Sequence, residues 1–241
     1  HRPMQLRIYR AGYTGNTVES RPLPVWHAGR YTRLAALLML TLARAAHAGA
    51  AAGIVPDGGT PTSVTTAGNG RQTVTIAPSV YGVSNNTYSS FNVGQAGATL
   101  DNTSANARTI VNQVTSTNPS LIEGDVTVLG SRANVVLANP NGITVNGGSF
   151  VKTGRVVLTT GQVSFFDQQL ASGEYQRNIA LNTQGGTIAI GPRGLAGTLI
   201  GLELIAKQIQ LNGPVTNSFS SSSAYVRAIA GTSQTTLDTG V

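Results

Sequence analysis

The chain has 241 residues, contains no cysteine and carries a formal net charge of +7 that is unevenly distributed. Residues 1–48 hold seven arginines against one glutamate, whereas residues 49–241 hold nine basic and eight acidic side chains and lack the clustered positive charge that nucleic-acid binding requires. All three histidines lie in the first 48 residues, so the rest of the chain cannot build a Ser-His-Asp triad, a Cys-His pair or a His/Cys zinc site. We therefore expect no catalytic residues, no metal site and no cofactor.

The amino-terminal segment has the order of a signal peptide. Its arginines precede an apolar run at 34–43, which is too short to span a hydrocarbon core of about 30 Å, and Ala46-His47-Ala48 follows. Small residues at 46 and 48 fit the small-x-small cleavage pattern. We expect residues 1–48 to be an extended signal peptide for the Sec machinery, removed between Ala48 and Gly49, which leaves no integral membrane segment. The alternative, a buried amphipathic helix, is disfavoured because the pattern lacks a 3.6-residue period.

From about residue 70 onward, short runs rich in Val, Ile, Leu and Thr recur between Gly, Asn, Pro and Ser residues, and helical patterns are nearly absent. Many short strands separated by turn residues indicate an all-β architecture. The predicted strands are Thr73–Ile76, Ala98–Leu100, Thr109–Val114, Val126–Leu129, Asn134–Leu137, Ile143–Val145, Arg155–Leu158, Thr187–Ile190, Leu202–Leu211 and Tyr225–Ile229.

An Asn-Pro-Asn-Gly segment joins two of these runs. Pro140 fixes its own φ and holds Asn139 extended, while Asn141 and Gly142 tolerate the left-handed backbone that redirects the chain. The segment therefore predicts a strand–turn–strand unit whose two strands are successive sides of one coil, joined by a single bend.

A sandwich, a closed barrel and a parallel β-helix all satisfy a series of short strands. The strand doublets and the composition, with 29 glycines and 10% charged residues, favour the β-helix, because its coils need sharp corners and its inward aliphatic side chains stack. With ~20 residues per coil and ~4.8 Å between strands, about 150 residues would form about seven coils in a rod about 35 Å long. We expect a cap around Ile54–Val83 to cover the amino-terminal strand edges. Because Thr239-Gly240-Val241 provides no polar cap, we expect residues 49–241 to be the amino-terminal part of a much larger protein.

Several sequence blocks carry a family resemblance through their order and spacing, although isolated Asn-Pro and Asn-Gly turns are common. The blocks are Tyr81–Ser84 with Phe91–Val93, Ile110–Val114, Asn118–Gly124, Ala138–Ile143 and Arg155–Gly161. Together they resemble the amino-terminal secretion domain of two-partner secretion (TPS) exoproteins, the filamentous-haemagglutinin-like or haemagglutination-activity domain. Two segments depart from the family pattern: Asp101–Ala107 stands where many members carry Asn-Pro-Asn-Leu, and Val145–Phe150 stands where some carry a cysteine pair.

This resemblance implies a right-handed parallel β-helix with some antiparallel strands packed on it and at its amino-terminal cap. It also implies a secretion module that the periplasmic POTRA domains of a cognate outer-membrane β-barrel transporter recognise, and that nucleates β-helix folding at the surface of a Gram-negative cell. Strand addition is the natural way for a transporter domain to bind an extended segment. A downstream region would make any contact with host cells or neighbouring bacteria.

The resemblance places the secretion motif in two turns and the residues beside them. These are Asn139, Pro140, Asn141, Gly142 and Ile143 in one block, and Asn118, Pro119, Ser120 and Leu121 in the other. We interpret the remaining asparagines as structural, because Asn accepts left-handed geometry at corners and can form hydrogen-bonded ladders between coils.

Two other functions stay open at this point. One is an adhesive module that binds glycans or host cells directly, and the other, less favoured, is a β-helical polysaccharide lyase or hydrolase. Glu123 and Asp125 are two residues apart and would share one side of a strand, the minimum for a paired-carboxylate or calcium site. No third carboxylate lies near them in sequence, so a solvated strand edge is the simpler interpretation.

Overall fold

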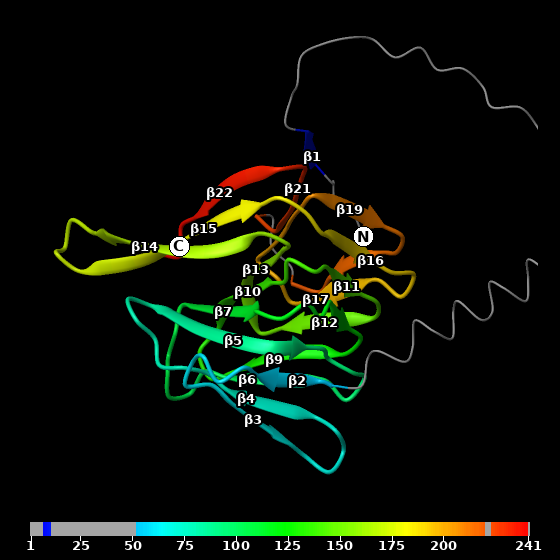
Figure 1. The fold of residues 1–241 in the computed structure, drawn as a ribbon, viewed down its shortest axis with the longest axis horizontal. Coiled ribbons are helices and arrows are strands. Elements are labelled where there is room, and N and C mark those ends of the chain that lie inside the picture. Colours follow the sequence, from blue (N-terminus) through cyan, green and yellow to red (C-terminus); the bar gives the residue numbers. More distant parts are fainter. Residues whose placement is uncertain (1–6, 11–51, 220–222, 241) are drawn as a thin grey trace, which may run out of the picture. The chain divides into compact units, whose positions relative to one another are not determined.

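The structure is a computed structural model that describes residues 7–10, 52–219 and 223–240, and all regular elements in these ranges are β-strands (Figure 1). The prediction of an all-β chain is therefore confirmed for this part of the protein. No helix in these ranges is long and apolar enough to cross a membrane. The expected cleavage site between Ala48 and Gly49 lies outside the described residues.

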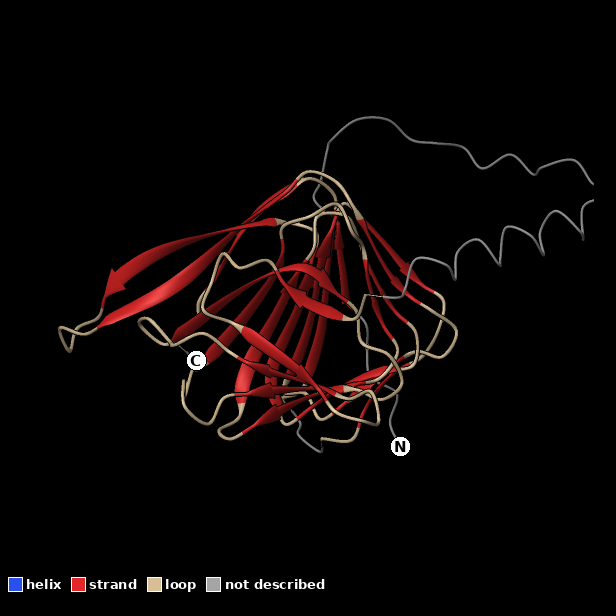
Figure 2. Cartoon of the chain, turned by 60° about the horizontal axis from the view of Figure 1, so that its bottom comes forward, coloured by secondary structure: helices blue, strands red, loops and turns tan. Residues whose placement is uncertain are grey.

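Three sheets form the faces of a parallel β-helix, and Figure 2 shows the strands of the largest face lying side by side. The first face contains β2 (Ile54–Pro56), β5 (Val83–Phe91), β7 (Thr109–Val114), β10 (Ala133–Ala138), β13 (Thr153–Thr159), β18 (Gly201–Ala206) and β21 (Tyr225–Ala230), with β1 (Arg7–Arg10) paired to β21. The second face contains β8 (Ser120–Ile122), β11 (Ile143–Val145), β16 (Thr187–Ile190) and β19 (Gln208–Leu211). The third face contains β3 (Ser63–Thr66), β4 (Gln72–Thr75), β6 (Ala98–Asp101), β9 (Asp125–Leu129), β12 (Gly148–Val151), β17 (Leu195–Gly197) and β20 (Val215–Asn217).

The chain visits the three faces in turn, as β10, β11 and β12 illustrate before β13 returns to the first face beside β10. This confirms that the two runs around the Asn-Pro-Asn-Gly segment are successive sides of one coil. The first face holds six parallel strands from β5 to β21, so the β-helix has about six coils, whereas we predicted about seven. The difference arises because one coil is lengthened by a hairpin that does not contribute to the stack.

The interior is a continuous apolar core in which equivalent positions of successive coils lie in register. Leu137, Leu158 and Leu204 are paired strand to strand and fully buried. Two buried asparagines occupy the same row in the first coils, and each donates to a carbonyl of the next coil: Asn86 to Val111 (3.2 Å) and Asn112 to Val136 (3.2 Å). The expected asparagine ladder therefore runs from side chain to backbone, which satisfies polar groups that would otherwise be costly to bury.

A fourth, antiparallel sheet covers the outer side of the first face. It contains β14 (Gln162–Gln169), β15 (Tyr175–Thr183) and β22 (Ser233–Leu237). A second apolar core lies between the two layers and comprises Val83, Val111, Val136, Val157 and Ile205 from the coils and Ile179, Leu181 and Leu237 from the antiparallel sheet, with Val163 and Phe165 packed against it. At the amino-terminal end, β2 pairs antiparallel with β5 and β3 pairs antiparallel with β4, so the expected cap is present.

Candidate functional site

The Asn-Pro-Asn-Gly segment forms the corner between β10 on the first face and β11 on the second. The N–H of Gly142 donates to the carbonyl of Asn139 (3.1 Å), which closes a β-turn with Pro140 and Asn141 at its centre. Gly142 has a φ of +115°, whereas Asn141 does not have a positive φ. The predicted strand–turn–strand unit is confirmed, but only the glycine uses the conformational freedom that we expected of both residues.

Asn139 is fully buried and holds this corner together. Its side-chain amide donates to the carbonyl of Asn118 (2.8 Å) and to the hydroxyl of Ser120 (2.9 Å). Its Oδ1 accepts from the backbone N–H and the side-chain amide of Asn141 (3.0 and 2.9 Å), and its own backbone N–H donates to the carbonyl of Thr159 in the next coil (2.9 Å). One side chain thus joins the two sequence blocks that the family resemblance assigned to the secretion motif.

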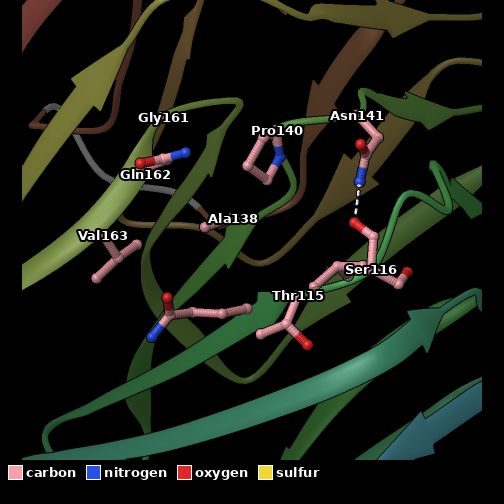
Figure 3. A pocket seen from close by; sticks show the side chains of 10 residues that line it. Thr115, Ser116, Ala138, Pro140, Asn141, Gly161, Gln162 and Val163 are labelled. Carbon is pink, nitrogen blue, oxygen red and sulfur yellow. Dashed lines mark hydrogen bonds between the residues drawn. The ribbon is translucent and has the colours of Figure 1, made fainter. Parts of the chain in front are cut away.

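Further hydrogen bonds extend this arrangement into a ladder over three coils, which we call the corner ladder: Ser89, Ser116, Asn118, Asn139 and Asn141. The side-chain amide of Asn141 donates to the carbonyl of Ser116 (2.7 Å; Figure 3). The hydroxyl of Ser116 and the side-chain amide of Asn118 both donate to the carbonyl of Ser89 (2.5 and 2.9 Å). The end of β5 and the corners that follow β7 and β10 are therefore tied to one another by side-chain-to-backbone bonds.

The predicted motif residues divide by exposure. The exposed members are Pro140, Asn141, Asn118 and Pro119, the buried members are Asn139, Gly142, Ile143 and Ser120, and Leu121 is half-buried. Ile143 pairs with Ser120 on one side and with Ile188 on the other, inside the second face. Only the exposed members can contact a partner once the protein has folded, and the buried members can act only through the conformation that they stabilise.

Asp57 links the amino-terminal cap to the coils beside the corner ladder, because Thr115 directly precedes Ser116. Its carboxylate accepts from the hydroxyls of Thr87 (2.5 Å) and Thr115 (2.6 Å) and from the N–H of Gly59 (2.7 Å). Burial acts to raise the pKa of this carboxyl, but the hydrogen bonds from Thr115, Thr87 and Gly59 outweigh it and hold the pKa of Asp57 below its usual value. Asp57 thereby links the cap to β5 through Thr87 and to the corner that follows β7 through Thr115.

Glu123 and Asp125 do not form a paired-carboxylate site. Glu123 accepts from the guanidinium of Arg193 (2.6 Å), whereas Asp125 accepts two hydrogen bonds from Arg71 (2.9 and 2.8 Å). The hydrogen bonds from Arg71 lower the pKa of Asp125 against the opposing effect of burial. Glu123 is neutralised by an arginine from another coil and Asp125 by an arginine from the cap, and the described ranges contain no group of three or more His, Cys, Asp or Glu residues that could hold a metal ion.

The segment that lacks the upstream Asn-Pro-Asn-Leu motif forms a different corner, between β6 on the third face and β7 on the first. Asn102 is buried there, and its side chain accepts from the N–H of Ala107 (2.7 Å) and donates to the carbonyl of the same residue (3.0 Å). It also donates to the carbonyl of Ser131 in the next coil (3.1 Å). A single buried asparagine therefore closes this corner without a proline.

Sequence reasoning missed Ser89, Ser116 and Asp57. One local signal was present, since Ser116 lies two residues before Asn118 and its hydroxyl accepts from the Asn118 N–H (3.0 Å), a common short-range motif of serine. Ser89 and Asp57 reach the site only through the stacking of coils and cap, which no local pattern reports.

These features define a β-helical scaffold whose distinctive polar residues lie at its corners. The model of the TPS secretion domain family matches residues 52–240, and the chain belongs to that family. This is a family of secretion domains and not of enzymes, so the lyase or hydrolase alternative loses its support.

Named relatives and a solved structure agree with this assignment. The chain is 32% identical over 201 residues to the filamentous hemagglutinin of Bordetella pertussis, covering 75% of the chain and 5% of that protein. It is 36% identical over 185 residues to a hemolysin of Proteus mirabilis, covering 68% and 11%. It is 35% identical over 181 residues to the tRNA nuclease CdiA-2 of Burkholderia pseudomallei, covering 66% and 6%. The crystal structure of the filamentous hemagglutinin secretion domain matches with a TM-score of 0.67 at 31% identity, covering 76% of this chain and 65% of that one.

Proposed function

We propose that residues 49–241 are the secretion module of a larger exoprotein of a Gram-negative bacterium. In this proposal the POTRA domains of a cognate outer-membrane β-barrel transporter recognise the module in the periplasm, and the β-helix nucleates as the chain emerges at the cell surface. Membership of the TPS secretion domain family supports a secretion role and a transporter partner. The share of each relative that the chain covers, 5 to 11%, supports a module rather than a whole exoprotein.

The corner ladder is the observation that carries this proposal. It joins three successive coils through buried Asn139 and exposed Asn141, and so it can form only when those coils stack. Before folding, the same segment presents extended backbone, a proline and free amide groups to a partner. The residues that a transporter would read in the unfolded chain are then the residues that close the first coils, which couples release from the transporter to nucleation.

The leader belongs to the same proposal. Residues 1–48 direct export through the Sec machinery and are removed between Ala48 and Gly49. Mass spectrometry of the secreted protein should find Gly49 at its amino terminus. An intact leader, or a terminus well inside residues 55–75, would contradict this processing.

Secretion and folding can be separated with two valine variants at asparagines that precede glycine. Asn141→Val removes an exposed rung of the corner ladder, whereas Asn69→Val alters an exposed turn whose asparagine bonds only to Arg71, two residues on. With the cognate transporter coexpressed, we expect Asn141→Val to lower the ratio of secreted to periplasmic protein several-fold and Asn69→Val to leave it unchanged. Both refolded proteins should melt within a few degrees of the wild type, because a solenoid spreads stability over many coil interfaces.

The comparison of the two variants decides the outcome. If Asn141→Val is secreted normally and loses much of its melting temperature, the ladder is structural and the assignment of Asn141 to secretion is wrong. If both variants are secreted equally poorly, the effect belongs to asparagine turns in general and not to the corner ladder.

A further inference from the structure

The antiparallel sheet ends in a strand whose outer edge is unpaired in the described part of the chain. β14 has eight residues and pairs only with β15. Natural edge strands are usually blunted by lysine, proline, a bulge or shortness. β14 contains no lysine or proline, its register with β15 runs without a shift, and its one charge, on Asp167, is held by Arg177 in two hydrogen bonds (2.8 and 2.9 Å).

The pairing geometry identifies which backbone groups are free. Arg177 lies opposite Asp167, yet its N–H donates to the carbonyl of Tyr81 (3.1 Å) on the side away from β14. The pair is therefore a non-hydrogen-bonded one, and antiparallel pairs alternate along the strands. The N–H and C=O groups that point outward from β14 are consequently those of Val163, Phe165, Asp167 and Gln169.

A cleft of about 480 Å³ lies against the beginning of this edge (Figure 3). Its walls come from β7, the Asn-Pro-Asn-Gly corner and β14, and include Gln113, Ala138, Pro140, Asn141, Gln162 and Val163. The lining contains amide and hydroxyl groups and small apolar groups but no ionisable side chain. Such a lining suits the backbone and uncharged side chains of a peptide better than a charged ligand.

A second copy of this chain fits the edge less well than a single strand when the two β14 strands pair antiparallel. Antiparallel pairing of two β14 strands would place both molecules' coils on the same side of the joined sheet. The coils of the second copy would then need the space beneath the outer edge of β14. In the first copy β7 and β10 already lie there, where they line the cleft. A single strand has no such layer beneath it and can lie along the edge with its inward side chains over Gln113.

We propose that folded β14 accepts one extended polypeptide strand from a partner protein, which extends the antiparallel sheet by β-augmentation and places a side chain in the cleft. Main-chain bonds to Val163, Phe165, Asp167 and Gln169 supply affinity, and the cleft supplies selection for an uncharged side chain. On the outer surface the added strand brings a β-branched or aromatic residue beside Phe166, which is 43% exposed. This site exists only in the folded domain, so it does not depend on how the unfolded chain is recognised during export.

The test uses the purified full chain and a fluorescent peptide of alternating threonine and valine with terminal lysines for solubility. We expect the peptide to bind in fluorescence polarisation, and a peptide N-methylated at every second amide to bind about ten-fold more weakly or not at all. In hydrogen exchange, the peptide should slow the amides of Val163, Phe165, Asp167 and Gln169 about ten-fold.

Two substitutions at Val163 distinguish the contribution of its backbone N–H to binding from that of its side chain. Val163→Pro removes an outward N–H that β15 does not use, and proline is tolerated on an edge strand, so the fold should persist while binding is lost. Val163→Ala keeps the N–H but removes a side chain that lines the cleft, so it should weaken binding much less than Val163→Pro. The proposal is overturned if Val163→Pro binds unchanged, if the N-methylated peptide binds equally well, or if neither peptide binds at 1 mM. A dimer in sedimentation that Val163→Pro abolishes would also overturn it, because the occupant would then be a second copy.

Discussion

The first face and the antiparallel sheet share an apolar core but are stabilised in different ways. The central strands of the first face, β7, β10, β13 and β18, are largely buried on both sides, between the interior of the coils and the second core, and each pairs with a coil strand on either edge. Strand β14 is half-buried on one side, at Val163 and Phe165, and has one neighbour and an exposed outer surface. The coils therefore depend on one another, whereas the antiparallel sheet depends on the coils without supporting their stacking to the same degree.

Stability and binding capacity therefore lie in separate layers of the molecule. A strand paired on both edges cannot accept another strand, and its side chains have no exposed surface to offer. A strand with one free edge contributes less to stability but keeps its hydrogen-bonding groups available. Four substitutions test this division, and we order them by the expected size of their effect.

The largest effect should come from the interior row of the coils. Leu158→Ala removes a fully buried side chain that stacks between Leu137 and Leu204, and we expect it to lower the free energy of unfolding by about 2–5 kcal/mol. Urea denaturation followed by circular dichroism measures the loss. Leu129→Ala is the matched control, since Leu129 is 47% exposed and should cost little. Equal losses would show that position in the stack does not determine stability.

Substitution of Asn139, at the centre of the corner ladder, should lower the free energy of unfolding by a smaller amount. Asn139→Ala leaves the Asn118 carbonyl and the Ser120 hydroxyl without their buried donor, and we expect a cost of about 1–3 kcal/mol. Asn118→Ala changes an exposed residue with a single side-chain bond to the Ser89 carbonyl and should cost less. Thermal melts of both refolded variants compare them, and a larger loss for Asn118→Ala would refute the central place of Asn139.

Removal of the Phe165 ring should increase local opening of the antiparallel sheet without unfolding the coils. Phe165→Ala removes a half-buried ring that packs against the second core and against the guanidinium of Arg177, and we expect a local cost of about 1 kcal/mol. Hydrogen exchange should accelerate in β14 and β15 and remain unchanged in β10. Phe166→Ala, which alters an exposed ring, is the control. Faster exchange in β10 would mean that the two layers unfold together.

The smallest effect concerns the exposed carboxylate of the cap. Hydrogen bonds from Thr115 and Thr87 lower the pKa of Asp57 in the folded protein, so its stabilisation is present above the unfolded pKa of about 3.9 and is lost as the pH falls through the lower folded value. Asp57→Asn should melt slightly below the wild type at pH 7, and the two melting temperatures should converge below about pH 4. A constant difference over this range would exclude ionisation of Asp57 as the cause.

Much of the coil structure could be predicted from local sequence, because its strands are β-branched runs between turn residues. The predictions for Thr109–Val114 and Ile143–Val145 match β7 and β11 at both ends. The hairpin of β14 and β15 was not predicted as strands from its residues, and antiparallel strands were expected only from the family resemblance. Only Val163 and Phe165 of β14 are half-buried, and the largely polar sequence of this strand lacks the dense run of aliphatic side chains that marked the coils.

The candidate site was predictable in part for a related reason. The turn at Pro140 and Gly142 depends on local backbone preferences, which sequence reports directly. The bonds from Asn139 to Ser120 and from Asn141 to Ser116 depend on which positions of successive coils become neighbours. That register follows from the lengths of the intervening corners and not from the identity of the residues that meet.

The hairpin also shows where this architecture can change in length. β14 and β15 leave the coil at the corner that follows β13, and the stack continues past them, since Thr159 still pairs with Ile205 and Ile143 with Ile188. A whole supersecondary unit has thus been inserted between two sides of one coil without a shift in register. The exposed hairpin tip at residues 170–174 is accordingly the position where a foreign peptide or small domain could be grafted for display on the folded module.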